Sequence, residues 1–208
     1  MTQPQPLATP ADLGRFLGRT LSEDEDFRAR MLLAVASEAV RGYCRQTLTY
    51  VASETVILTG NWGSELVLPE RPVTAVTSAS INSTSLSVNV DFVWDGASKL
   101  YRGSRQYSTG PVPYNGSGQD PMRHELHWGG PSAQVTVVYS HGLTATDRRM
   151  TLPRGIVCEL AAAGMAVTPG IRQESLGQYS YTAEAGASRA SELSAGQRRA
   201  LRDAGLRR

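Results

Sequence analysis

The chain has 208 residues, 40% of them hydrophobic, and a formal net charge of +2, so it suits one domain, or one domain with a large insertion, that buries a core without disulfides or a metal. No run approaches the roughly 18 consecutive apolar residues that span a bilayer, and the N-terminus lacks the basic start and apolar run of a signal peptide. A membrane protein and a secreted precursor are therefore not expected, and we predict a protein that is made and used in a cytoplasm.

The N-terminal segment predicts a disordered start followed by a short helix. Residues 1–8 are polar and contain proline, which favours disorder. The stretch TPADLGRFLGR then supplies Thr9 as a helix N-cap, Pro10 at the first helical position and Asp12 in the first turn. We therefore expect a short amphipathic helix to begin at Pro10.

A long helix is predicted next. Ser22 and Glu25 have the spacing of a capping box and lie in an acidic turn that suits the helix N-terminal dipole. Apolar residues then recur over about 24 residues, roughly 36 Å of helix. We predict that they form the face that packs in the core: Phe27, Met31, Val35, Ala39 and Tyr43, with Leu32, Ala36 and Val40 beside them.

The sequence becomes β-rich after this helix. Short runs of valine, threonine and aromatic residues, such as TVILTG, VTAVTSASI, SLSVNVDFVWDG (residues 85–96) and SAQVTVVYSHG, alternate with glycine, proline, asparagine and aspartate. They predict about six strands that form an antiparallel sheet or a small sandwich. The segment 103–121 is dense in turn formers and lacks periodicity, so it is predicted to be a long loop or a segment ordered only by a partner.

The C-terminal quarter of the chain predicts a helix, a strand and a final helix. Thr151 and Pro153 open a helical pattern in TLPRGIVCELAAAGMAV. Residues 175–183, SLGQYSYTA, alternate apolar and polar positions like a strand. Ser194 then caps a last helix, LSAGQRRALRDAG, which has a thin apolar side and many arginines elsewhere.

Together these elements predict an α+β fold. Residues 9–50 and 151–169 form a helical core of long antiparallel helices, and residues 51–150 form an inserted antiparallel β-rich body. Residues 170–208 form an extended C-terminal strand plus helix, predicted to be a docking arm.

The histidines offer two weak hypotheses for chemistry. His124 and His127, with Glu125 between them, suggest a metal site, but the glycines and proline that follow argue against a sustained helix there. His141 ends a strand and is a formal candidate for the base of a hydrolase, yet no G-x-S-x-G nucleophile motif accompanies it. We adopt the interpretation that His124 and His127 are a solvated or loop-packing pair and that His141 is a strand-terminal turn residue.

Two cysteines, Cys44 and Cys158, lie far apart within apolar helical patterns, which favours two buried thiols over a disulfide or redox pair. No catalytic residue, metal or cofactor is therefore predicted, and the protein is not expected to be an enzyme.

Positive charge gathers at the C-terminus, where residues 189–208 carry a net charge of +4 before the terminal carboxylate. Such a tail favours polyanions, including DNA, by counterion release. No aromatic residue is interleaved with these arginines in the sequence, so base stacking is not supported. A solvated helix face, or one that docks on an acidic protein surface, is the favoured interpretation, and a basic DNA-binding accessory protein is the alternative.

The order of these motifs resembles a known family. TPADLGRFLGR and LLAVASEAVRGYC near the start, followed by LPRGIVCELAA, ESLGQYSYTA and LSAGQRRALR near the end, are similar to the head-to-tail connector (adaptor) proteins of tailed bacteriophages. The resemblance covers roughly residues 9–50 and 150–206; the β-rich middle adds little to it, and the loop segment GPVPYNGSGQDP departs from it.

The resemblance implies a structural protein of the virion neck that is present in the host cytoplasm while the particle assembles. It would form a ring, a dodecamer, under the portal, extend the DNA channel without reading sequence, and join the capsid to a downstream neck or tail protein. The C-terminal strand and helix would reach toward the portal protein or a neighbouring copy. The sequence does not choose between the long helix and the β-rich body as the contact between copies.

A physical argument agrees with a docking role for the late strand. A strand separated from the sheet by a helix leaves backbone N–H and C=O groups unpaired, and the edge of another chain's sheet would satisfy them. An added edge strand on the protein's own β-rich body is the alternative. The residues predicted to dock on the portal or a neighbouring subunit are Leu176, Tyr179, Tyr181, Arg198, Arg199 and Arg202.

Overall fold

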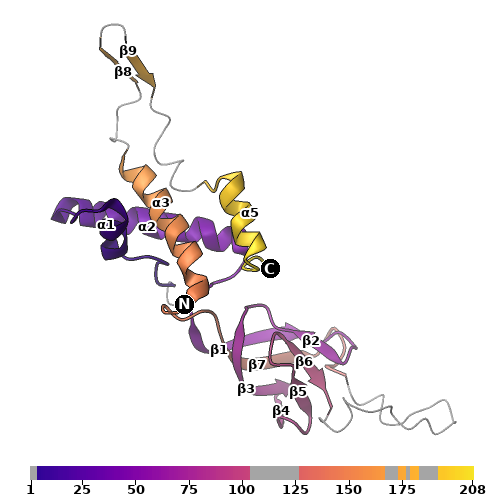
Figure 1. Ribbon diagram of the computed structural model, residues 1–208. Helices are drawn as coiled ribbons and strands as arrows, with labels where there is room; N and C mark the ends of the chain where they lie inside the picture. Colours follow the sequence, from indigo (N-terminus) through magenta and orange to yellow (C-terminus); the bar gives the residue numbers. More distant parts are fainter. Residues whose placement is uncertain (1–3, 104–126, 167–172, 177–178, 183–191) are drawn as a thin grey trace, which may run out of the picture. The chain divides into compact units, whose positions relative to one another are not determined.

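Two stretches far apart in the sequence form the first of two compact units, residues 1–49 with 143–208, and the segment between them, residues 50–142, forms the second (Figure 1). The computed structural model describes residues 4–103, 127–166, 173–176, 179–182 and 192–208. The predicted loop 103–121 lies almost wholly outside the described residues. The predicted α+β class with antiparallel sheets is confirmed.

The first unit is helical, and its helices begin where the caps predict. Thr9 and Asp12 form a capping box at the start of α1, Ser22 and Glu25 do so for α2, and Ser194 caps the last helix together with Gln197. The helices are α1 (Pro10–Leu17), α2 (Glu23–Cys44), α3 (Thr151–Met165), preceded by the short 3₁₀ helix η2 (Arg148–Met150), and α5 (Ala195–Asp203).

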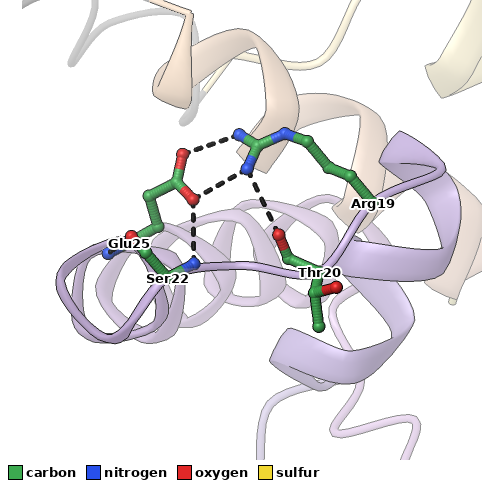
Figure 2. A network of polar contacts seen from close by, with 4 residues as sticks. All are labelled: Arg19, Thr20, Ser22 and Glu25. Atoms are coloured by element: carbon green, nitrogen blue, oxygen red, sulfur yellow. Dashed lines mark hydrogen bonds and ion pairs between the residues drawn. The ribbon is translucent and has the colours of Figure 1, made fainter.

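The turn between α1 and α2 is held by a polar network, shown in Figure 2. Arg19 donates from its two terminal nitrogens to the two carboxylate oxygens of Glu25, each at 2.7 Å. Glu25 also accepts the backbone N–H of Ser22 at 3.0 Å. The Arg19 hydrogen bonds, followed by the one from Ser22, lower the pKa of Glu25 to about 2. The network therefore fixes where the long helix begins.

The buried face of α2 agrees with the predicted one only in part. Phe27, Met31 and Val35 are 73%, 61% and 44% exposed. The stripe that enters the core consists of Ala29, Leu33, Ala36, Val40 and Cys44, of which Ala36 and Val40 belong to the predicted face. Both stripes have helical spacing, but the buried one has smaller side chains, which allow close packing against α3.

The N-terminal segment also differs from the prediction of disorder. Leu7 and Ala8 are buried in the helical core. The backbone N–H of Leu7 donates to the Ser37 hydroxyl at 2.9 Å. The buried guanidinium of Arg41 donates to the carbonyl of Gln5 and, at 3.0 Å, to that of Thr47. Polar groups on α2 thus tie this segment to the core, a role that local composition does not reveal.

The second unit is a two-sheet β structure. One sheet has the strand order β1-β7-β3-β4 and the other β2-β6-β5, and every strand pair is antiparallel. The predicted run 85–96 divides into two strands instead of one. The strands are β1 (Val51–Thr59), β2 (Glu65–Val67), β3 (Val73–Ile81), β4 (Thr84–Leu86), β5 (Phe92–Trp94), β6 (Lys99–Arg102) and β7 (Gln134–His141).

Both sheets contribute to one core. Leu66, Phe92 and Leu100 from the smaller sheet cluster with Val135 and Val137 from the larger one. Trp128 completes the cluster: its ring is fully buried, and its indole N–H donates to the carbonyl of Ser64 at 3.0 Å. The arrangement is that of a small sandwich, one of the two alternatives that the sequence left open.

The predicted late strand is a hairpin. β8 (Gln173–Leu176) pairs antiparallel with β9 (Tyr179–Thr182), so the alternation that suggested one strand spans a strand, a reversal and a second strand. This pair is a separate two-stranded sheet and joins neither sheet of the second unit.

No helix within the described residues is long and apolar enough to cross a membrane.

Candidate docking surfaces

The hairpin holds three of the six predicted docking residues. The register pairs Leu176 with Tyr179 and Glu174 with Tyr181. Since alternate positions of a strand lie on the same face, positions 174, 176, 179 and 181 belong to one face of the ribbon. Each strand is hydrogen-bonded along one edge only in the part of the chain that the structure describes. The outer edges are therefore available for strand addition.

The last helix, which belongs to the predicted docking arm of residues 170–208, packs against the helical core on its apolar side. Leu201 is fully buried, and Leu193 and Leu206 lie in the same cluster as α2 and α3. Gln197 of α5 donates to the Glu159 carboxylate on α3 at 3.0 Å. The apolar side of α5 thus reaches its own unit, and only its arginine-bearing remainder is left for a partner.

The other three predicted docking residues line one groove. Arg198, Arg199 and Arg202 project from α5 into an open groove of about 850 Å³. Tyr43 of α2 and Arg207 complete its basic and aromatic wall, and its remaining lining comes from residues 192–195. We call this surface the arginine groove. Arg207 belongs to the basic C-terminal group that the sequence analysis identified, whereas sequence reasoning missed Tyr43 because α2 and α5 lie far apart in the sequence.

Charge in the arginine groove is only partly neutralised. Asp203 lies 3.5 Å from Nε of Arg199 and 3.7 Å from Nε of Arg202. Arg207 lies over the Tyr43 ring, 4.8 Å from its centroid. Among the residues that the structure describes, Arg198 has no ion pair. Guanidinium groups bind carboxylates and phosphates by charge-assisted hydrogen bonds, so the groove suits an acidic partner surface or a phosphate backbone.

The catalytic hypothesis for His141 meets a physical obstacle. Its side chain is 1% exposed, and Nε2 lies 2.5 Å from the Glu54 carboxylate. Tyr139, whose ring centroid is 5.1 Å away, is equally buried. Burial is the main cause that raises the pKa of the Tyr139 phenol. A general base must come within hydrogen-bond reach of its substrate, and His141 does not reach the surface.

The metal hypothesis rested on residues 124–127. His124 and Glu125 lie outside the described residues. The His127 Nδ1 accepts the backbone N–H of Gly129 at 2.9 Å, and its ring makes an edge contact with Trp62 at 5.2 Å between centroids. No three histidine, cysteine, aspartate or glutamate side chains within the described residues are grouped to hold a metal ion. His127 therefore packs in a turn, as the loop-packing interpretation states.

The prediction of two buried free thiols is confirmed for Cys44 and Cys158. Burial raises the pKa of each thiol to about 11. The reactive thiolate is consequently scarce at neutral pH.

Comparisons with known proteins give structural likenesses. No protein-family model and no curated protein matches the chain. The chain is similar to a chain of the virion of a native gene transfer agent (GTA) particle, with a TM-score of 0.47, 18% identity, and coverage of 82% of this chain and 84% of the other. It is also similar to chains in two GTA neck structures. In the neck of an empty particle computed with C6 symmetry the TM-score is 0.44, with 16% identity and coverage of 78% and 82%. In the neck of a native particle computed with C12 symmetry the TM-score is 0.43, with 17% identity and coverage of 80% and 81%.

Proposed function

We propose that this protein is a head-to-tail connector of a tailed-phage-like particle: a structural neck protein that forms a ring under the portal, extends the DNA channel and joins the capsid to the next neck or tail component. The resemblance of its sequence motifs to the adaptor family supports this function. Twelve copies in the ring, a portal partner and a downstream neck or tail partner are what that resemblance implies.

The observation that carries the proposal is the separate β8–β9 hairpin. An isolated two-stranded hairpin is marginally stable at best in water, and in the described part of the chain this one pairs with no third strand. Strand addition by a partner would satisfy its open edges and provide the missing stabilisation. Leu176, Tyr179 and Tyr181 would supply the apolar and aromatic contacts, since aromatic residues are enriched at the cores of interfaces.

The arginine groove has a second role in the proposal. α5 is held on the helical unit by Leu201, so Arg198, Arg199 and Arg202 are presented from a fixed helix and not from a free tail. A fixed basic groove favours an acidic surface of the portal or of a downstream protein through electrostatic complementarity. In this proposal the docking element is the hairpin, and α5 stays packed on the helical unit and contributes its arginines to the contact.

The test replaces residues 173–182 by a glycine–serine linker of equal length and keeps α5. The purified variant should keep the melting temperature of the parent protein and should no longer cosediment with portal rings from the same particle. A second variant, Tyr179→Ser with Tyr181→Ser, should weaken cosedimentation without loss of thermal stability. Tyr101→Ser, which alters a partly exposed tyrosine of β6, serves as the matched control. Normal portal binding by the linker variant would exclude the hairpin as the docking element.

The arginine groove also favours the alternative function, a DNA-binding accessory protein. Here the structure adds an aromatic residue, Tyr43, that the sequence does not place beside the arginines. Its ring is already covered by Arg207, which leaves little of it for base stacking. Mobility shifts of a short duplex at rising salt distinguish the two functions. Tight binding that weakens steeply with salt and is lost on Arg198→Ala with Arg202→Ala would favour the DNA-binding protein.

A further inference from the structure

α2 carries a second apolar face that the described residues of its own unit leave open. Phe27, Met31 and Val35 follow one another at four-residue spacing and are mostly exposed, while a different stripe of the same helix fills the core. We call these three residues the outer stripe. Single exposed apolar residues are common, but three large ones in a row on one helix face are typical of an interaction surface.

An apolar groove lies on the same unit. It has a volume of about 730 Å³ and is open to solvent. We call it the α3 groove. Its apolar lining comes from α1, α3 and the end of α5, and its rim carries Arg148, Arg149 and Glu159; the lining residues are Phe16, Leu152, Gly155, Ile156 and Ala204.

Gly155 gives an independent reason to expect a partner in the α3 groove. It lies inside a 15-residue helix, where glycine is destabilising relative to alanine. A Cβ atom added at Gly155 would meet nothing within 4 Å, so none of the residues that the structure describes requires a glycine there. Close approach of another backbone or a bulky side chain is a physical reason for the missing side chain.

We propose that the outer stripe of one copy packs into the α3 groove of a second copy, head to tail. This inference rests on the proposed ring and names the surfaces that close it. From Phe27 to Val35 the stripe spans about 12 Å, and from Thr151 to Glu159 the groove spans about 12 Å, at 1.5 Å per residue. The two surfaces therefore match in length.

Charge fixes the direction of packing. Glu23 and Asp24 precede the outer stripe, are exposed, and form no ion pair within the described part of the chain. Arg148 precedes the groove, is exposed, and is likewise without an ion pair among the described residues. With the two helices parallel, Phe27 lies level with Leu152 and the acidic turn lies level with Arg148. An antiparallel arrangement would bring the acidic turn toward Glu159 instead.

The use of two different surfaces is what a ring needs. When two unlike patches form the contact, each added copy is rotated by the same angle, and a ring forms if these rotations add up to a full turn. A contact between two identical stripes joins two copies and leaves neither stripe for a third. The outer stripe and the α3 groove are unlike patches on one rigid set of helices. Each copy therefore offers one surface to each neighbour.

Disulfide trapping tests the contact in the full-length protein. Two variants with one added cysteine each, Phe27→Cys and Thr151→Cys, are mixed and oxidised, with the buried natural thiols left in place; Thr151 is exposed and lines the α3 groove. The mixture should give a crosslinked dimer that neither variant gives alone, and the double variant should give a ladder of higher species. A mixture of Phe27→Cys with Gly196→Cys, an exposed position of α5 outside the groove, is the matched control. Crosslinking by Phe27→Cys alone, or none in the first mixture at any protein concentration, overturns the inference.

A charge exchange adds a second readout in the crosslinking background. Arg148→Glu, or Glu23→Arg with Asp24→Arg, should lower the crosslinked yield about tenfold, which corresponds to about 1.4 kcal/mol. Combining both changes in one chain should restore most of the yield. Arg15→Glu, an exposed arginine of α1, should leave it unchanged. No recovery in the combined variant would overturn the proposed direction of packing.

The outcome is separable from that of the proposed function. If the crosslink forms but the linker variant of the hairpin still binds portal rings, the proposed docking element fails and the contact between copies stands. If the hairpin variant loses portal binding but no crosslink forms, the connector function stands and this contact fails.

Discussion

Replacing Leu201 by alanine tests whether α5 is part of the helical core or a detachable arm. Leu201 is fully buried in the cluster that α2 and α3 form. The backbone N–H of Leu206 donates to its carbonyl at 3.1 Å, and the N–H of Arg208 donates to the carbonyl of Cys44 at 3.0 Å. The helix is thus closed at its end and tied to α2, and the leucine side chain is its deepest contact.

The expected loss follows from the cavity that alanine leaves. Substitution of a buried leucine by alanine costs about 2 to 5 kcal/mol. A terminal helix of nine residues shifts to fill part of the space, which places the loss near 3 kcal/mol. For a chain of this size that corresponds to a fall in melting temperature of roughly 6 to 12 °C. It is also a large share of a typical stability of about 5 to 15 kcal/mol.

Urea unfolding followed by circular dichroism measures this loss, and limited trypsin digestion reports local release of α5 at its arginines. Arg198→Ala, an exposed change on the same helix, should alter stability by less than about 0.5 kcal/mol. If Leu201→Ala loses under about 1 kcal/mol and digests no faster than the parent, α5 is not anchored as described. That result would favour an arm in which all of residues 170–208 detach from the helical core.

Three further changes test local features of the structure. The folded pKa of Glu25, about 2, lies below its ordinary value of 4.5, so its stabilising effect is complete above pH 4.5 and is lost as pH falls toward 2. The melting temperature of Glu25→Gln should therefore depend less on pH in that window, and an unchanged slope would contradict the Arg19 contact. Gly155→Ala should stabilise the isolated protein by about 0.5 to 1 kcal/mol. Added to the Thr151→Cys chain, it should also lower the yield of the crosslink with Phe27→Cys, whereas Gly196→Ala should change the stability alone. Equal crosslink yields would show that the groove tolerates a methyl group. Gly60→Ala places a Cβ atom 2.5 Å from the carbonyl oxygen of Gly130. The substitution should therefore destabilise the β-rich unit by about 3 kcal/mol or more. An unchanged near-ultraviolet spectrum and melting curve would contradict that close approach.

Local signals in the sequence were sufficient to locate the helix starts and most of the strands. The capping boxes at Thr9, Ser22 and Ser194 depend on residues three positions apart, so a short window contains the whole interaction. Strand runs bounded by turn residues are local in the same way. The division of the run 85–96 between two strands was missed because β-forming residues occur on both sides of the turn. The residues of the turn itself do not differ enough in type from their neighbours to mark it.

Features that depend on partners distant in the sequence could not be predicted. The burial of Leu7 depends on Ser37 and its helix, and the arginine groove depends on Tyr43, which is more than 150 residues away from Arg198. The hairpin register pairs Leu176 with Tyr179, and a period of two residues alone does not distinguish one strand of nine residues from two of four. In each case the local pattern is compatible with two arrangements, and tertiary packing selects between them.

The two apolar faces of α2 show why its buried side could not be predicted from the sequence. Helical periodicity finds apolar stripes but does not state what each one packs against. A helix in a self-contained monomer needs one such stripe, and the stripe with the larger side chains would ordinarily be the buried one because it removes more apolar area from water. Here the stripe of smaller residues fills the core while Phe27 and Met31 stay exposed. Residues with a large hydrophobic driving force thus lie outside the core that the described residues of this unit form, and this is the physical basis for our proposal that a second copy covers them.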